Sequence, residues 1–194
     1  MLKPRTFLYA AVALAAGLTL SSCASGSPAT DSASSSASQT TAAFNSADVT
    51  FAQMMIPHHE QAVQMSDDLL AKEGIDQSVI DLATEIKAAQ EPEITLLKDW
   101  LTAWGEDDSS MSGMDGGSDG MMSDDDMMAL HDASGVGAST LFLEQMTVHH
   151  EGAVAMAQLE IDDGENADAR ALAADIVATQ TAEMAVMAEL LASL

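Results

Sequence analysis

The sequence predicts an all-α fold, a four-helix bundle assembled from two helical hairpins. Apolar residues recur at helical spacing in four long segments, and no run alternates apolar and polar residues in the way typical of a strand. An internal repeat is the third observation: the pattern Met-x-x-His-His-Glu-x-Ala-Val-x-Met occurs at 55–65 and again at 146–156. Two amphipathic hairpins bury their apolar stripes best against each other, which gives a bundle.

The first hairpin is expected to begin at Ser46 or Asp48, since either side chain is a suitable helix cap. Gly74 marks the turn between its two helices, and Gly105 ends the second helix. Pro57 lies inside the first helical pattern. Because proline removes a backbone donor and clashes with the preceding turn, the first helix either kinks at Pro57 or starts there.

The second hairpin is expected to follow a shorter helix. This short helix is predicted over 124–133, and Gly135 and Gly137 are expected to break it before the next long helix. The two long helices of the second hairpin are expected over about 139–162 and 167–193.

Residues 1–23 are expected to be a lipoprotein signal peptide. Lys3 and Arg5 precede an apolar stretch that is short for a membrane-spanning helix, and the stretch ends in Leu-Ser-Ser-Cys, which resembles a bacterial lipobox. We therefore expect Cys23 to carry a lipid that anchors an exported protein to the cell membrane, facing the extracytoplasmic side. The alternative is an ordinary secretory signal with an incidental cysteine.

The rest of the chain divides into a tether and a bundle domain. Residues 24–45 are rich in Ser and Ala, as expected of a flexible tether. Residues 46–194 form the bundle domain, with a connection rich in Met, Asp and Gly at 106–126. The methionines in and just after this connection, with His131 nearby, either capture Cu(I) or belong to an acidic linker that partly caps the bundle. They are Met111, Met114, Met121, Met122, Met127 and Met128.

The charge of the chain excludes one class of function. The formal net charge is −25, from 31 acidic and 6 basic residues. Two of the basic residues lie in the predicted signal peptide, so the mature chain has almost nothing that could neutralise phosphates, and nucleic-acid binding is excluded. A negative field of this kind attracts cations and also keeps an exported domain soluble. Cys23 is the only cysteine, so no intrachain disulfide can form.

The first histidine of each His-His pair is predicted to face the core. At about 100° per residue, the apolar residues around His58 and His149 lie within about 60° of these histidines on the helix surface. His59 and His150 lie about 100° further round, at the edge of the apolar stripe. They are either metal ligands or edge residues that form hydrogen bonds.

The second helix of each hairpin carries a glutamine and a glutamate that are expected to lie beside the histidines. His58 and Gln90 are each 16 residues from Gly74, and equal counts mean equal height in an antiparallel hairpin. If a pseudo-two-fold axis relates the hairpins, the two layers converge. Such a buried polar layer needs partners, which either a metal ion or a His–Gln hydrogen-bond network supplies. The four residues are Gln90, Glu93, Gln180 and Glu183.

Thioether and imidazole groups together favour copper among the common metals. Methionine sulfur favours Cu(I), and imidazole accepts either oxidation state. Zinc is usually held by cysteine, histidine or carboxylate. Ferritin-type iron sites need Glu-x-x-His, and none of the five histidines follows a glutamate at this spacing. Taken singly, however, methionines on an apolar stripe are most often core packing.

Several features of the chain occur together in one known family. They are Met55-Ile56-Pro57-His58-His59 with Ala62 and Met65, the Gln90-x-x-Glu93 that follows, and the second copy of the motif. On these features the chain resembles the domain of unknown function 305 family over residues 46–194. The resemblance implies a ferritin-like four-helix bundle in an exported or lipid-anchored protein, and some members of the family are implicated in copper binding and resistance.

The resemblance also implies which side chains bind the metal. They are Met55, His58, His59, Met65, Met146, His149, His150 and Met156. The second copy departs from the family's pattern at Thr147-Val148, which affects backbone shape more than ligation.

These observations predict an extracytoplasmic protein that binds and sequesters copper in homeostasis or resistance, without catalytic turnover. One alternative is a structural or interaction module in which the His–Gln layer only specifies packing. A further alternative is a copper-dependent oxidase, although the sequence supplies no dedicated acid, base or substrate pocket.

Overall fold

The computed structural model describes residues 43–107 and 120–194, which form five helices and no strand. The helices are α1 (Ser46–Leu70), α2 (Gln77–Trp104), α3 (Asp124–Asp132), α4 (Gly135–Asp163) and α5 (Ala167–Leu191). The predicted all-α class and its four long helices are therefore confirmed. The predicted signal peptide and residues 24–42 of the predicted tether lie outside the described residues, as do residues 108–119 of the predicted connection. None of the helices described is long and apolar enough to cross a membrane.

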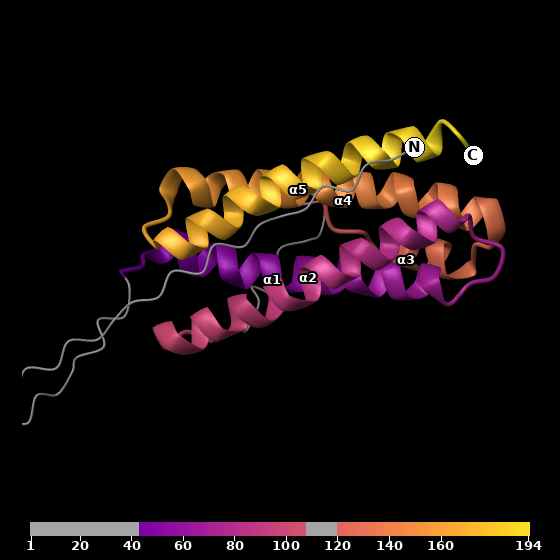
Figure 1. Ribbon diagram of the computed structural model, residues 1–194. Helices are drawn as coiled ribbons and strands as arrows, with labels where there is room; N and C mark the ends of the chain where they lie inside the picture. The colour runs from indigo at the N-terminus through magenta and orange to yellow at the C-terminus, as the bar shows by residue number, and fades with distance from the viewer. Residues whose placement is uncertain (1–42, 108–119) are drawn as a thin grey trace, which may run out of the picture. The chain divides into compact units, whose positions relative to one another are not determined.

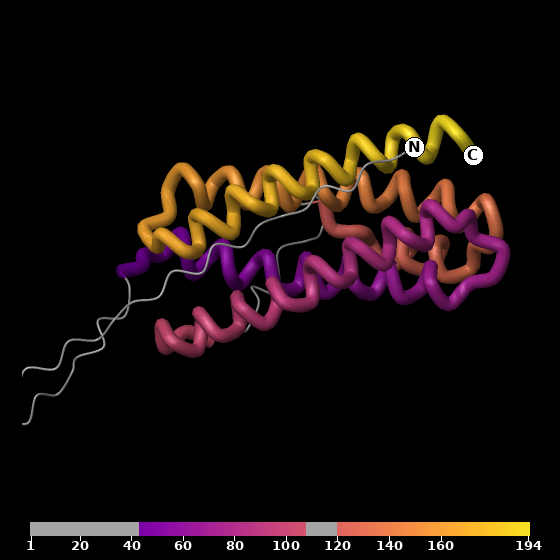
Figure 2. Tube along the Cα trace, viewed as in Figure 1, coloured from indigo at the N-terminus to yellow at the C-terminus, as the bar shows by residue number. Residues whose placement is uncertain are grey.

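The four long helices form two antiparallel hairpins that lie against each other. Helix α1 packs along α2, and α4 packs along α5 (Figure 1). The hairpins meet chiefly through α1 and α4, and their turns lie at opposite ends of the bundle, as the Cα trace in Figure 2 shows. The short helix α3 packs against α1 and α4 and buries Leu130.

The start of α1 corrects the predicted cap. Neither Ser46 nor Asp48 is the N-cap, because Asn45 holds that position and its side chain accepts the backbone N–H of Ala47 and Asp48. The carboxylate of Asp48 in turn accepts the N–H of Asn45 at 2.6 Å, which completes a capping box. The helix then runs through Pro57 without ending, so it does not start there. Gly74 lies in the turn with a left-handed φ of +75°, as its predicted role requires.

The start of α4 also differs from the prediction. This helix begins at Gly135 rather than near 139, after an extended Ala133 and Ser134. Gly135 has a φ of +53°, and its conformational freedom lets the chain turn from α3 into α4. Gly137 does not break a helix, because it is the third residue of α4 and lies in the first turn.

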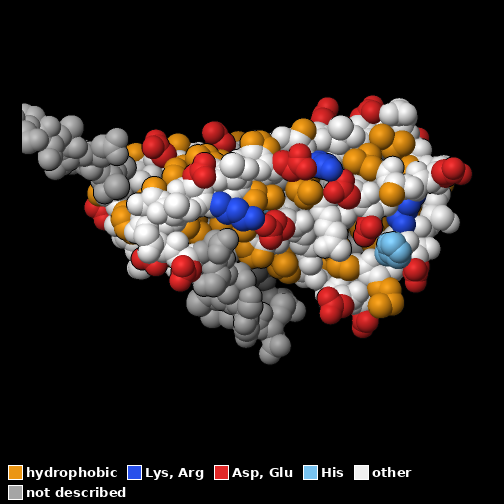
Figure 3. Space-filling view, turned by 90° about the horizontal axis from the view of Figure 1, so that it is seen from below, with side chains coloured by type: hydrophobic (Ala, Val, Ile, Leu, Met, Phe, Trp, Pro, Cys, Tyr) orange, Lys and Arg blue, Asp and Glu red, His pale blue; other side chains and the backbone are white. Residues whose placement is uncertain are grey.

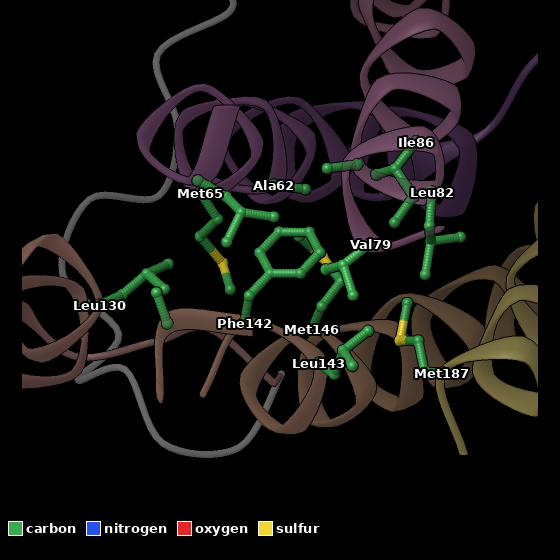
Figure 4. Close-up of a cluster of buried hydrophobic side chains, with 13 residues drawn as sticks. Ala62, Met65, Val79, Leu82, Ile86, Leu130, Phe142, Leu143, Met146 and Met187 are labelled. Carbon is green, nitrogen blue, oxygen red and sulfur yellow. The ribbon is translucent and has the colours of Figure 1, made fainter. Parts of the chain in front are cut away.

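Two apolar clusters fill the bundle, one on each side of its middle. The first lies towards the α1–α2 turn and contains Met65, Phe142 and Met146 (Figure 4). The second lies towards the α4–α5 turn and contains Phe51, Met55 and Met156. Because each cluster draws residues from opposite ends of α1 and α4, these two helices cross in antiparallel orientation. The layer between the clusters is where the two His-His pairs lie.

Candidate metal centre

His58 of α1 and His149 of α4 meet where the two hairpins cross. Their ring centroids are 3.7 Å apart with an angle of 37° between the planes. The two residues are 1% and 0% exposed, respectively. The predicted convergence of the two layers is thus present in the structure. Since the rings are in contact, no ion fits between their faces, and a metal would have to be held at the ring edges, where the nitrogens are.

The second histidine of each pair is held by a glutamate of the neighbouring helix. His59 Nε2 lies 2.7 Å from Glu93 Oε2, and His150 Nε2 lies 2.7 Å from Glu183 Oε2. Both histidines have fully buried side chains. The hydrogen bonds that one of the two predicted alternatives required are therefore present, but both histidines lie deeper than the edge of the apolar stripe. In addition, the hydrogen-bonded partners of the glutamates are His59 and His150, one residue beyond the histidines of the central contact.

The paired glutamates fix which histidine nitrogens remain for a ligand. If Nε2 of His59 and of His150 donates its proton to the carboxylate, Nδ1 keeps a lone pair. Both Nδ1 atoms are buried and form no hydrogen bond. A carboxylate that orients an imidazole in this way is the usual support for a metal-binding histidine.

His149 is buried without a well-formed hydrogen bond to either ring nitrogen. Burial lowers the pKa of His149 well below its ordinary value, and the three other histidines of the layer lower it further. The backbone of His58 acts in the opposite direction, but it is the smallest of these influences. The imidazole is therefore neutral at physiological pH, which is the form that binds metals.

Gln90 and Gln180 complete the polar layer from α2 and α5. Each is 3% exposed, and the side-chain oxygen of each has no hydrogen-bond donor. The predicted placement of both glutamines in the core is confirmed. Buried polar atoms almost always have partners, so this layer has more unsatisfied polar atoms than packing alone explains.

The four motif methionines flank the histidine layer in two pairs. Met55 and Met156 lie in one apolar cluster, and Met65 and Met146 lie in the other. Three of the four are fully buried, and Met156 is 7% exposed. They are core residues, as expected of methionines on an apolar stripe, and their thioethers are soft donors on the same two helices as the histidines.

The donors present fit a soft metal ion better than a hard one. Across residues 43–107 and 120–194, no group of three or more His, Cys, Asp or Glu side chains is arranged to hold a metal. The unsatisfied imidazole nitrogens and adjacent thioethers are instead the donor set that favours copper, and Cu(I) above all. A metal bound here would draw on these two donor types together.

The predicted methionine-rich connection is only partly described. Met111 and Met114 lie outside the described residues, whereas Met122 and Met127 pack against the apolar cluster of Met65. These two methionines cap the bundle, as one of the two interpretations required. Met128 is 60% exposed, so its thioether does not contribute to the core.

Sequence reasoning missed a clamp that holds the end of this connection. The side chain of Gln61 donates to the carbonyl of Met122 at 2.9 Å and accepts its N–H at 2.7 Å. A Cβ on Gly120 would lie 2.6 Å from the carbonyl oxygen of Val148 and 2.9 Å from the Cα of Gly152. The segment therefore crosses from α1 to α4. The available signal was a difference between the motif copies, since Gln61 of the first matches Gly152 of the second.

The chain belongs to the family described as domain of unknown function (DUF305), which it matches over residues 48–191. A DUF305 protein of Streptomyces coelicolor, assigned as secreted, has 33% sequence identity and a TM-score of 0.70, covering 76% of this chain and 93% of its own. A DUF305 fragment of Deinococcus radiodurans has 29% identity and a TM-score of 0.71, covering 77% and 98%.

A third similar structure carries copper. CopM in its Cu(II)-bound form has 31% identity and a TM-score of 0.65, covering 75% of this chain and 96% of its own. CopM also has Cu(I)-bound, Ag-bound and apo structures that are similar to this chain. No curated protein matches the sequence.

Proposed function

We propose that this protein binds and sequesters copper outside the cytoplasm. The observation that carries the proposal is the buried layer of four histidines, placed between two pairs of methionines, in which His59, His149 and His150 have ring nitrogens without a well-formed hydrogen bond. The proposal is also supported by CopM, a similar protein whose structures contain bound Cu(I), Cu(II) and Ag. Binding rather than turnover is the proposed activity.

The proposed ligands are the histidines and methionines of the two motif copies. Nδ1 of His59 and of His150 would bind the metal while Glu93 and Glu183 hold the opposite nitrogens. His149, and His58 beside it, would contribute at the ring edges after a rotation that separates the two rings in contact. The thioethers would add the soft donors that favour Cu(I). They belong to Met55, Met65, Met146 and Met156.

The surface supports a role in collecting cations. Acidic side chains far outnumber Lys and Arg in the chain, and Figure 3 shows them spread over one face of the molecule. A negative field raises the local concentration of cations and speeds their arrival. We further propose that residues 1–23 direct export and that a lipid on Cys23, followed by the tether of residues 24–45, holds the bundle at the extracytoplasmic face of the membrane.

The test is a titration of residues 24–194 with Cu(I) and Cu(II) against competing chelators. One variant replaces the four motif histidines with glutamine, and another replaces the four motif methionines with leucine, which conserves volume. A matched control replaces two exposed residues of the same types, His131→Gln with Met128→Leu. Circular dichroism checks that each variant keeps its helices.

The expected result is tight, saturable binding that the histidine variant loses for both ions. The methionine variant is expected to lose Cu(I) binding more than Cu(II) binding, because thioethers prefer the softer ion. Binding that is weak, or that survives in the histidine variant, would overturn the proposal. The polar layer would then be an element of bundle architecture.

A further inference from the structure

The polar cavity between α2 and α5 is the feature that the proposed binding layer does not explain. These two helices approach each other less closely than the other neighbouring pairs of long helices. The cavity is lined from both sides by matching residues, namely Gln90 and Glu93 of α2 and Gln180 and Glu183 of α5. The same glutamates hold His59 and His150, so the cavity lies next to the histidine layer on the α2–α5 side.

The lining of this cavity suits a cation in transit. Gln90 and Gln180 are only 3% exposed, and the side-chain oxygen of each accepts no hydrogen bond. An unpaired buried acceptor costs about 1–3 kcal/mol, and water or a passing cation would satisfy it. The carboxylates of Glu93 and Glu183 are 24% and 15% exposed, so they connect solvent to the buried imidazoles.

An acidic groove leads along the same helices to this cavity. Thr179 and Glu183 line both the cavity and a neighbouring surface groove, so the two adjoin at these residues. The groove also contains Asp81 and Glu85, both exposed. Carboxylates placed along a groove focus the negative potential and guide cations towards its inner end.

The opposite side of the histidine layer is covered in the described part of the chain. The segment that begins at Gly120 crosses from α1 to α4, held by the hydrogen bonds between Gln61 and Met122. Among the described helices, α1 with α2 and α4 with α5 make the most extensive contacts. Within the described residues, the α2–α5 side therefore offers a polar approach to the histidines.

We propose that the α2–α5 seam is the entrance through which a copper ion reaches the histidine layer. Asp81 and Glu85 attract the ion, Glu183 and Glu93 receive it at the mouth, and the amide oxygens of Gln90 and Gln180 hold it during passage. This inference rests on the proposed copper binding, and it adds the route. The residues of the seam would then set the rate of copper binding, and the histidines and methionines of the motif would set its affinity.

The test compares rates of Cu(I) uptake in residues 24–194, followed by stopped flow as the protein withdraws Cu(I) from a coloured chelator complex. In the first variant, Gln90→Leu with Gln180→Leu fills the cavity with apolar groups. Its matched control, Gln64→Leu with Gln158→Leu, makes the same change at exposed positions of α1 and α4. We expect the seam variant to take up Cu(I) roughly tenfold more slowly than the control, since it loses the oxygens that would contact the ion.

A second variant keeps the test independent of core packing. Asp81→Asn with Glu85→Gln changes only exposed residues of the groove, and Glu106→Gln with Asp107→Asn removes two exposed charges beyond the end of α2. We expect the groove variant alone to slow uptake, with a weaker dependence on ionic strength and an unchanged equilibrium affinity.

The outcomes separate this inference from the function on which it rests. Tight equilibrium binding in the unchanged protein, with uptake rates in both seam variants equal to those of their controls, would overturn the entrance and leave copper binding intact. Failure of the unchanged protein to bind copper would overturn both. Slower uptake confined to the α2–α5 variants would establish the route.

Discussion

A single pair of carboxyl groups ties the start of α1 to the end of α4. Asp48 and Glu160 are 0% and 1% exposed. Burial, with a smaller contribution from the neighbouring Asp48, raises the pKa of Glu160 to about 8. Burial also acts to raise the pKa of Asp48, but hydrogen bonds from backbone amides, including that of Asn166 at 2.8 Å, bring it below its ordinary value. The pair therefore holds one proton near pH 7, on Glu160.

Glu160→Gln should remove part of the pH dependence of stability. Because the folded-state pKa of Glu160 lies above its ordinary value of 4.5, its contribution is fully present below about pH 4.5 and is lost as pH rises through about 8. The unchanged protein should lose up to about 1.4 kcal/mol of unfolding free energy per pH unit from this group within that window. The variant, which mimics the protonated acid, should show a flatter profile.

Urea denaturation at several pH values between 5 and 9 measures this difference. Glu189→Gln changes an exposed glutamate of α5 and serves as the control. Parallel stability profiles for the two variants would show that Glu160 is ionised in the folded protein.

If the role of His149 is to bind metal, this residue should lower the free energy of unfolding of the metal-free protein. Both of its ring nitrogens are buried without a well-formed hydrogen bond, a state that costs about 1–3 kcal/mol. His149→Leu should therefore leave the metal-free protein as stable as before or more stable by about 1 kcal/mol. The same variant should lose the rise in melting temperature that Ag(I) or Cu(I) produces by binding the folded state.

Thermal unfolding with and without the metal ion measures both parts of this prediction. A structural role for the histidine gives the opposite pattern, in which the metal-free variant is clearly less stable and no metal-dependent rise exists to be lost.

At the scale of a helix, α1 contains an interruption that α4 lacks. Pro57 lies inside α1 one residue before His58, and Val148 stands at the matching place before His149. A proline within a helix costs about 3 kcal/mol, because it removes the hydrogen bond to the carbonyl four residues earlier and clashes with it. Part of this cost is offset because proline also restricts the unfolded chain.

Pro57→Ala should stabilise the protein by about 1–2 kcal/mol, since α4 shows that an uninterrupted helix is compatible with the same histidine layer. Chemical denaturation measures the change, and Pro92→Ala in α2 gives a comparison at a second proline within a helix. Destabilisation at Pro57 alone would show that the packing of α1 against its neighbours depends on a local distortion at that residue.

Helical spacing predicted where the helices lie in the sequence. It predicted less well how much of each helix surface is buried. The count of about 100° per residue placed His58 and His149 in the core, because a single apolar stripe is a local property of the sequence. It placed His59 at an edge because it treats each helix as having one covered face. In the structure α1 has α2 on one side and α4 on another, so the buried arc is wider and includes His59. Glu93, which pairs with His59, belongs to the α1–α2 contact.

At the scale of the whole molecule, the docking of the hairpins decides the site, and no local pattern contains it. The contact between His58 and His149 depends on where α1 crosses α4, which is set by the two apolar clusters on either side. Equal counts to each turn gave the height of the layer but not the crossing. Nor could spacing predict that Gln61 would hold the backbone of Met122, because the two residues are 61 positions apart and Met122 lies outside the helical pattern.

Attachment to the membrane is the remaining property of the whole chain, and it rests on the sequence. If Cys23 is the lipidated residue of a lipobox, Cys23→Ser should abolish lipid attachment, because the lipid is joined through the sulfur, and should leave the signal peptide uncleaved. Growth with a labelled fatty acid and intact-mass measurement detect the two changes, and Ser35→Ala in the tether is the control. The bundle itself should be unaffected, since its first helix begins at Ser46. Normal cleavage without lipid in the unchanged protein would instead identify an ordinary secretory signal and a bundle that is released rather than anchored.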